Sequence, residues 1–403
     1  MKYLLTIICA ACLLTACHHH DEEPEPVQRA VLVYMAADNN LSGFTSGDIH
    51  QMMKGSELLT PNQKLLLFID KLNQPPYVLE VAGGDTTRLN YKYKEDLRTS
   101  DAETLGEALR LMRNRYPQAE SYGLVLWGHA TGWEIKDEGT ASARANGPRR
   151  AYGYDGTYGG HWLEIPDMAK VLSEMPQLEF IFADCCAFQC IESAYELRHA
   201  TKYIIASAAE IPGDGAPYQT ITPALFSTSE NFYETIVDEY FKQEIAGLKE
   251  PLSVIKTSEL ENLAAATHDA LVAADSLVTV VDSVNKYPDV KGLIYYYDQA
   301  NFDMQDAMMH YVTDSTAYAT WKQAFDKAVV YKTFTPKWMT DYYNPHVFFY
   351  DFEATEERYG GVSMFVPQDP SSRYKRTEFF ARMNRTINRM EWYNAVGLSD
   401  FGW

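Results

Sequence analysis

Apolar runs of strand length alternate with helical patterns between residues 30 and 210. The strand-like runs cover residues 30–37, 64–70, 122–129, 178–185 and 203–210. Amphipathic segments separate these runs, and one of them carries Leu105, Ala108, Leu109 and Met112 at helical spacing. Continuous apolar strands separated by helices predict an α/β fold with a mainly parallel sheet that is covered by helices on both faces.

The pattern changes past about residue 245. The later elements are two helical patterns and one strand-like run, at residues 258–281, 315–330 and 360–367. Ser258 and Glu261 have the spacing of a capping box at the start of the first helix. We therefore expect one domain over residues 30–245 and a mixed, mostly helical C-terminal subdomain over residues 246–403.

The N-terminal segment has the pattern of an export signal. Lys2 precedes an apolar run over residues 4–14 that is too short to span a bilayer. The sequence LTAC at residues 14–17 resembles a bacterial lipobox, in which cleavage precedes the cysteine and the cysteine takes the lipid. It predicts a lipoprotein signal peptide over residues 1–16 and lipidation at Cys17, although a plain secretory signal has a similar pattern.

An acidic, proline-bearing tether follows over residues 17–29, and the whole chain is acidic. The sequence has 35 Lys plus Arg against 55 Asp plus Glu, a formal charge of -20. This balance excludes a basic surface for nucleic acid or for anionic lipid. We expect no nucleic-acid partner, and an exported protein whose N-terminal lipid holds it on the outer membrane or the cell surface.

Cysteine is rare in the chain outside the signal segment. The motif FADCCAFQC at residues 182–190 carries the three remaining thiols, Cys185, Cys186 and Cys190. Three such neighbours close no long loop, so a disulfide framework is excluded. A metal site that adds His129 or His161 is an alternative, but adjacent cysteines without a second pair fit the usual zinc spacings poorly. We therefore expect no bound metal.

Two of the predicted strands end on residue types that carry out nucleophilic catalysis. The run LVLWGH ends at His129, and the run FIFADCC ends at Cys185 and Cys186. Neighbouring parallel strands would bring a thiol and an imidazole to one edge of the sheet. A helix beginning behind the cysteine would favour the thiolate, and His129 would protonate the leaving amine. The arrangement predicts a cysteine peptidase, and the alternative is a buried cysteine beside a hydrogen-bonded histidine.

Three longer motifs occur in a fixed order: YGLVLWGHATGW, FADCCAFQCIESAYEL and YIIASAAEIPGDGAPY. Together with the opening VLVYMAADNNL they resemble the clostripain family of cysteine peptidases, in the clan of caspases, gingipains and legumain. The resemblance is clear over residues 28–220 and looser beyond them. It implies a caspase-like α/β/α sandwich and a cysteine endopeptidase. It also implies no required cofactor, although Ca²⁺ serves some relatives, and we expect a monomer.

Matched residue by residue, the resemblance makes Cys186 the nucleophile and His129 the catalytic histidine. The backbone N–H groups of Ala130 and Cys186 would hold the oxyanion. The family usually has Gly in place of Ala130 and Ala in place of Cys185, and a vicinal disulfide between Cys185 and Cys186 would switch the site off. Cys190 is expected one turn into the following helix, in a structural role.

The resemblance also implies an acidic S1 pocket. Asp184 matches an acid at the floor of that pocket. Asp214 is a plausible second acid, although it is also a typical turn residue between two glycines. Two carboxylates would select Arg or Lys at P1 by charge-assisted hydrogen bonds. The expected partners are therefore proteins or peptides with Arg or Lys at P1.

Residues 134–155 form a long polar segment after the histidine strand. Family members are often zymogens that cut themselves in this loop, which implies self-cleavage with Arg144 and Arg150 as candidate sites. A flexible surface loop is the alternative for this segment. The alternative for the whole chain is an inactive family member that acts as a surface binding lipoprotein.

Overall fold

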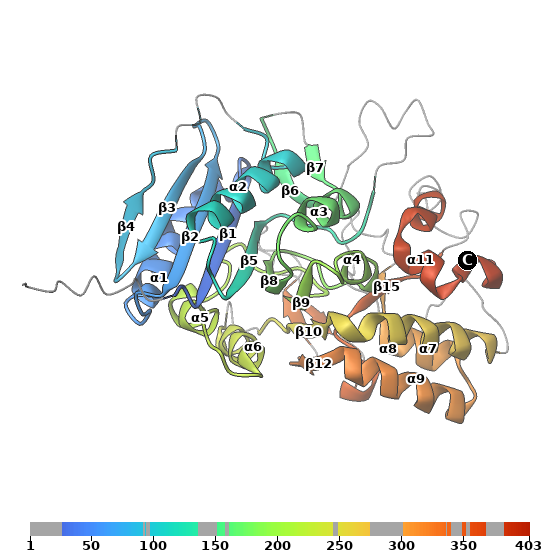
Figure 1. The fold of residues 1–403 in the computed structure, drawn as a ribbon. Helices are drawn as coiled ribbons and strands as arrows, with labels where there is room; N and C mark the ends of the chain where they lie inside the picture. The colour runs from blue at the N-terminus through green and yellow to red at the C-terminus, as the bar shows by residue number, and fades with distance from the viewer. Residues whose placement is uncertain are drawn as a thin grey trace, which may run out of the picture.

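The computed structural model describes residues 26–91, 93, 97–135, 151–157, 161–244, 249–274, 301–335, 337–339, 349–351, 355–367 and 383–403. A mixed sheet with the strand order β12-β10-β9-β8-β5-β1-β2-β3-β4 forms its centre (Figure 1). Its strands are β1 (Arg29–Ala37), β2 (Gln63–Lys71), β3 (Tyr77–Ala82), β4 (Asp85–Arg88), β5 (Ser121–Gly128), β8 (Leu178–Asp184), β9 (Thr201–Ala206), β10 (Ser253–Lys256) and β12 (Val329–Lys332).

The middle of this sheet is parallel and its two ends are antiparallel. Strands β2, β1, β5, β8 and β9 pair in parallel, whereas β3, β4, β10 and β12 pair antiparallel. The five parallel strands are the five that the apolar runs predict. The predicted α/β fold with a mainly parallel central sheet is confirmed.

Helices cover both faces of the sheet, as Figure 1 shows. One face packs against α2 (Ala102–Arg115), α3 (Ile165–Leu172) and α4 (Ile191–Glu196). The other packs against α1 (Thr45–Ser56), α5 (Tyr218–Ala224) and α6 (Phe232–Lys242). Along β1, Leu32 and Tyr34 enter the first core and Val31 and Val33 the second, all fully buried. Burial on both faces explains why such strands are continuous apolar runs.

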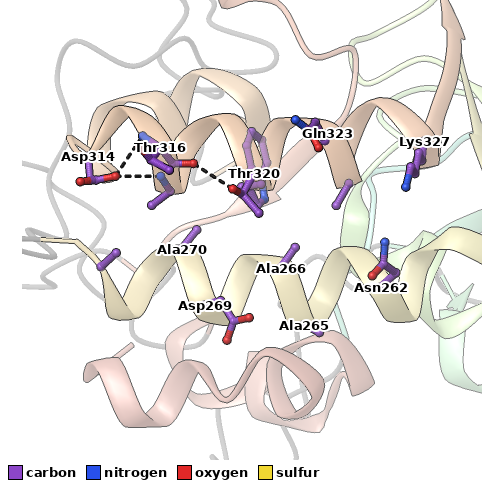
Figure 2. A pocket seen from close by; sticks show the side chains of 14 residues that line it. Asn262, Ala265, Ala266, Asp269, Ala270, Asp314, Thr316, Thr320, Gln323 and Lys327 are labelled. Carbon is purple, nitrogen blue, oxygen red and sulfur yellow. Dashed lines mark hydrogen bonds between the residues drawn. The ribbon is translucent and has the colours of Figure 1, made fainter.

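The chain beyond residue 246 extends the same sheet and adds helices beside it. Strands β10 and β12 join the sheet next to β9. The helices of this part are α7 (Leu260–Val272), α8 (Met304–Tyr311), α9 (Ser315–Ala328) and α11 (Glu391–Val396). Helices α7 and α9 lie side by side, and an open groove of about 740 Å³ runs between them (Figure 2). No helix in the described ranges has the length and hydropathy needed to cross a membrane.

The predicted capping box at the start of α7 is wrong. A 3-10 turn over Thr257–Glu259 precedes the helix, and no side chain caps its first turn. The carboxylate of Glu261 instead accepts from Tyr195 Oη of α4 at 2.5 Å and from Nε of Arg198, just after α4, at 2.6 Å. A partner on a neighbouring helix has replaced the local cap.

Three short two-stranded sheets complete the described elements. They pair β6 (Tyr152–Asp155) with β7 (His161–Leu163), β11 (Asn301–Asp303) with β15 (Ser363–Phe365), and β13 (Lys337–Met339) with β14 (Phe349–Asp351). The β6–β7 hairpin lies against the ends of β1 and β5, where Asn39 Nδ2 donates to Tyr154 O at 2.7 Å. It therefore borders the edge of the sheet at which the predicted reactive residues lie.

Candidate active site

Strands β5 and β8 are neighbours and end at the same edge of the sheet. They run in parallel, with Trp127 of β5 paired with Asp184 of β8. The chain leaves β5 towards His129 and leaves β8 towards Cys186, so the register brings both residues to this edge. The predicted pairing of the two strands is confirmed.

His129 follows Gly128, whose φ of 148° favours glycine. The Nε2 atom of His129 lies 2.8 Å from Asn40 Oδ1. An amide oxygen only accepts, so this contact assigns the ring proton to Nε2 and leaves Nδ1 as the basic nitrogen. The rings of Tyr154 and Trp162 lie 6.4 and 6.5 Å from the imidazole. Burial lowers the pKa of His129 to about 4, which favours the neutral ring.

Cys186 lies in the turn that follows β8 and is half-buried. Its Sγ atom accepts from Ile211 N at 3.4 Å. Burial, and then the negative charge of Glu210, raises the pKa of Cys186 to about 12. The prediction that a helix beginning directly behind Cys186 favours its thiolate is wrong, because α4 begins only at Ile191. The resting thiol is therefore protonated.

The other two cysteines lie in the core. Cys185 is buried against the first face of the sheet, and both Cys185 and Cys186 are free thiols. Cys190 is fully buried and donates from Sγ to Ser193 Oγ at 3.0 Å. It precedes the first residue of α4, so its predicted position one turn into the helix is wrong. Ala187, between these cysteines, has a φ of 51° and shapes the turn.

Ala130 sits in a short antiparallel bridge with Tyr152. The flanking hydrogen bonds run from Thr131 N to Ala151 O at 3.0 Å and from Gly153 N to His129 O at 2.9 Å. The bridge therefore uses its neighbours rather than the N–H of Ala130. Among the described non-glycine residues, positive φ occurs at Asn73 and Ala187, so an alanine fits the backbone at position 130.

Asp184 is the buried acid at the end of β8. Its Oδ2 accepts from Tyr218 Oη at 2.7 Å and from Ala216 N at 3.1 Å. Its Oδ1 is buried and has no hydrogen-bond partner. Burial raises the pKa of Asp184 to about 6. Asp214 is exposed on the loop before α5.

Asn40 and Asp48 are site residues that the sequence reasoning missed. Asn40 lies in the 3-10 turn η1 (Asn40–Gly43) after β1 and contacts His129. Asp48 lies on α1 with 2% of its surface exposed, and its Oδ2 accepts from Trp127 Nε1 at 2.8 Å. The four-residue spacing from Asp48 to the buried Met52 was the available signal, because it placed an acid on the buried face of the helix.

Several predicted residues have no described position. Cys17, Arg144 and Arg150 lie outside the described residues. Within the described ranges, no group of three or more His, Cys, Asp or Glu side chains has the arrangement of a metal site. His161, which the metal alternative named, has its Nδ1 atom 3.0 Å from Ser100 Oγ.

Comparisons with known proteins place this chain in a family. A sequence model described as the clostripain family matches residues 33–398. The structure of a secreted C11 cysteine protease from Bacteroides thetaiotaomicron, bound to an irreversible peptide inhibitor, is similar with a TM-score of 0.77 and 27% identity. That of an inactive zymogen C11 protease from Parabacteroides distasonis is similar with a TM-score of 0.74 and 28% identity. Each alignment covers 93% of this chain and 99% of the other.

Two further comparisons add less. A second secreted C11 cysteine protease from Bacteroides thetaiotaomicron has a TM-score of 0.75 at 21% identity, with 93% of this chain and 100% of that chain covered. At this identity the likeness supports the fold alone. A search of curated protein sequences found no match.

Proposed function

This chain belongs to the clostripain family and is a cysteine protease, and from this premise we propose that it cleaves after Arg or Lys with a Cys186–His129 dyad. The observation that carries the proposal is the buried Asp184, two residues before Cys186, whose Oδ1 atom has no hydrogen-bond partner. A buried carboxylate oxygen without a donor is costly, and a cationic P1 side chain would donate to it.

The dyad would start from its neutral form. Nδ1 of His129 would take the proton of Cys186 as Sγ attacks the carbonyl carbon of the scissile bond. The N–H groups of Ala130 and Cys186 would stabilise the oxyanion. The imidazolium would then give its proton to the leaving amine, which departs as the acyl-enzyme forms. His129 would then take a proton from water as its oxygen attacks the acyl carbon, the carbon–sulfur bond would break to release the carboxyl product, and His129 would return the proton to Sγ.

Asn40 would act as a positioning residue in this sequence. Its Oδ1 atom holds the Nε2 proton of His129 at 2.8 Å, which keeps Nδ1 free of a proton. When His129 becomes an imidazolium, the same contact opposes rotation of the ring. Asn40 touches neither the substrate nor the thiol in this scheme.

A peptide panel tests the proposed function. The purified chain and its Cys186→Ala variant would receive fluorogenic peptides that differ only in ending with Arg, Lys, Asp or Ala. We expect cleavage after Arg or Lys that is lost in the variant. Cleavage after Asp or Ala alone would remove the acidic pocket from the proposal. No cleavage by folded protein whose loop has been cut with trypsin would favour the inactive binding lipoprotein.

Self-cleavage is the second part of the proposal. An enzyme that prefers Arg would cut at Arg144 or Arg150, and a relative is described as an inactive zymogen. We expect the wild-type chain to split during purification, whereas Cys186→Ala remains one chain. Two pieces from the pure variant would contradict self-cleavage.

Lipid anchoring at Cys17 is the third part, and one similar protein is described as secreted. Cells grown with a radiolabelled fatty acid should label the protein, and Cys17→Ser should remove the label. Equal labelling of both proteins would contradict the assignment. We also expect a chelator of Ca²⁺ to leave peptide cleavage unchanged, because the proposed steps use protein groups and water.

A further inference from the structure

Asp48 is a buried carboxylate that the proposed catalytic steps do not use. It belongs to α1, yet its Oδ2 atom reaches the sheet and accepts from Trp127 Nε1 at 2.8 Å. Trp127 pairs in register with Asp184 on the neighbouring strand. Asp48 therefore lies at the same strand ends as the proposed S1 acid, although it comes from an element far from Asp184 in the sequence.

Gly215 brings the two acids together. A Cβ atom added to Gly215 would lie 3.1 Å from Asp184 Oδ2 and 3.2 Å from Asp48 Oδ2. The φ of Gly215 is +67°, a conformation that favours glycine. Two buried carboxylate oxygens thus face one small volume that any side chain at position 215 would fill.

The groups around Asp48 determine the pKa of its carboxyl group. Burial is the main cause of its raised pKa, and the carboxylates of Asp184 and Asp214 raise it further, while the bond from Trp127 lowers it. The resulting pKa of Asp48 is about 8. From α5, the hydroxyl of Tyr218 faces both acids and donates to Asp184 at 2.7 Å. Two neighbouring buried carboxylates of this kind do not both ionise.

We propose that Asp48 is an acid of the S1 pocket, that Asp48 and Asp184 share one proton while the pocket is empty, and that the guanidinium of a P1 arginine replaces this proton. The inference rests on the proposed function and assigns Asp48 as a specificity residue. A guanidinium has five donors in a fixed fork, enough for two carboxylates, whereas an ammonium is a point charge. The pocket therefore favours Arg over Lys.

Binding of arginine releases the shared proton to the solvent. The empty pocket holds one proton and one negative charge, and the occupied pocket holds two carboxylates and the cation. Near neutral pH, where the empty pair keeps its proton, binding should release about one proton per ligand. A neutral P1 side chain offers no charge to replace the proton, so it should release none.

The experiment counts protons by calorimetry on the Cys186→Ala chain after its loop has been cut with trypsin, so that the chain is in the cut form and binds peptides without cleaving them. The ligands are a short peptide ending in arginine and the same peptide ending in citrulline, the uncharged isostere of arginine. Titrations at pH 7 in two buffers of different ionisation enthalpy give the number of protons released. The second protein carries Asp48→Asn as well, and the matched control carries Asp269→Asn, at an exposed acid on α7.

We expect about one proton released for the arginine peptide, none for the citrulline peptide and close to none when Asp48→Asn is present. Arginine binding without proton release, or an unchanged release in the Asp48→Asn protein, would overturn the role of Asp48 and leave the cationic pocket standing. No preference for arginine over citrulline in the Cys186→Ala chain would overturn the proposed specificity itself. If the Asp48→Asn protein does not fold, the proton count in the Cys186→Ala chain, which keeps Asp48, still decides whether arginine displaces a proton.

Discussion

The candidate site has two halves that differ in how their side chains are held. His129 and Cys186 follow strand ends directly, and each is only partly buried. Asp48 and Asp184 are almost fully buried and accept from Trp127, Tyr218 and a backbone N–H. We call the first pair the reacting half and the second pair the acid half. One half is built to exchange a proton, and the other is built to hold charge at a fixed position.

The two halves differ in charge when the site is empty: the reacting half is neutral, and the acid half carries one proton and one negative charge. Burial lowers the pKa of His129 to about 4 and raises that of Cys186 to about 12, so neither carries charge near neutral pH. The acids are also raised, Asp184 to about 6 and Asp48 to about 8. The charges needed for chemistry would form within the reacting half during the reaction, whereas the second carboxylate charge of the acid half would form when a cation enters it.

The largest expected effect comes from the reacting half. His129→Ala should lower kcat/KM by about 10²- to 10⁴-fold, the usual contribution of a general acid and base. The loss should be the same for arginine and citrulline peptides, because His129 acts on the scissile bond and not on the P1 side chain. Steady-state kinetics on the two peptides measure it. A loss confined to the arginine peptide would mean that the two halves are not separable.

Asp184→Asn should also lower kcat/KM strongly, but by an amount that depends on the P1 side chain. Truncating one charge of a buried pair costs about 2–5 kcal/mol, or roughly 30- to several-thousand-fold in kcat/KM. We expect that loss for the arginine peptide and a much smaller one for the citrulline peptide. Asp269→Asn is the matched control, because this acid is exposed on α7, in the helical part of the chain, and screened by water. Equal losses for both peptides would show that Asp184 supports the nucleophile instead.

The central strands could be predicted from the sequence because they are buried on both faces. Strand β1 has no polar position between Ala30 and Ala37, so its pattern needs no partner to be recognised. Strand β3 carries Glu80 among its apolar residues and is only partly buried, and β10 and β12 are four residues each. Such edge strands depend on neighbours that a local pattern does not contain.

The site also contains features that a local sequence pattern predicts and features that it does not. The placement of His129 and Cys186 could be predicted because each lies within two residues of the end of a recognisable strand. Asn40 could not, because its contact with His129 depends on how a 3-10 turn folds back over the strand end. For Asp48, the spacing to Met52 signals burial, but its contact with Trp127 could not be predicted, because the two residues are 79 positions apart. The raised pKa of Cys186 depends first on burial and then on the charge of Glu210, and both follow from the packing of segments that are distant in the sequence.

The reacting half should also respond strongly to pH. Since burial raises the pKa of Cys186 to about 12, the thiolate fraction should rise about tenfold per pH unit through the neutral range. Alkylation of the intact chain by iodoacetamide should therefore accelerate from pH 6 to pH 10 without a plateau. The Cys186→Ala chain gives the background from the buried cysteines. Glu210→Gln should react faster at each pH, and a plateau near pH 7 would mean that the thiolate already exists.

Asn40→Ala should cause a moderate loss that separates positioning from chemistry. One hydrogen bond is worth about 1 kcal/mol, so kcat should fall up to about tenfold while KM stays unchanged. Because the ring then loses its preferred tautomer, the pH profile of kcat should change shape as well. Asn40→Asp, which keeps an acceptor at the same position, should restore part of the rate. A rise in KM alone would place Asn40 in substrate binding.

The smallest expected effect comes from an acid that lies outside the site. Asp314 caps α9, where its Oδ1 atom accepts from Thr316 N at 2.9 Å and from Ala317 N at 2.8 Å (Figure 2). Asp314→Ala should lower the free energy of unfolding by about 1 kcal/mol through the loss of this cap. It should leave the arginine-to-citrulline ratio of kcat/KM unchanged, because α9 belongs to the helical part of the chain. Denaturant unfolding and the two peptides measure both effects. A changed ratio would mean that a charge far from Asp48 and Asp184 affects selectivity at P1. The acid half would then have to include residues beyond these two acids and their direct contacts.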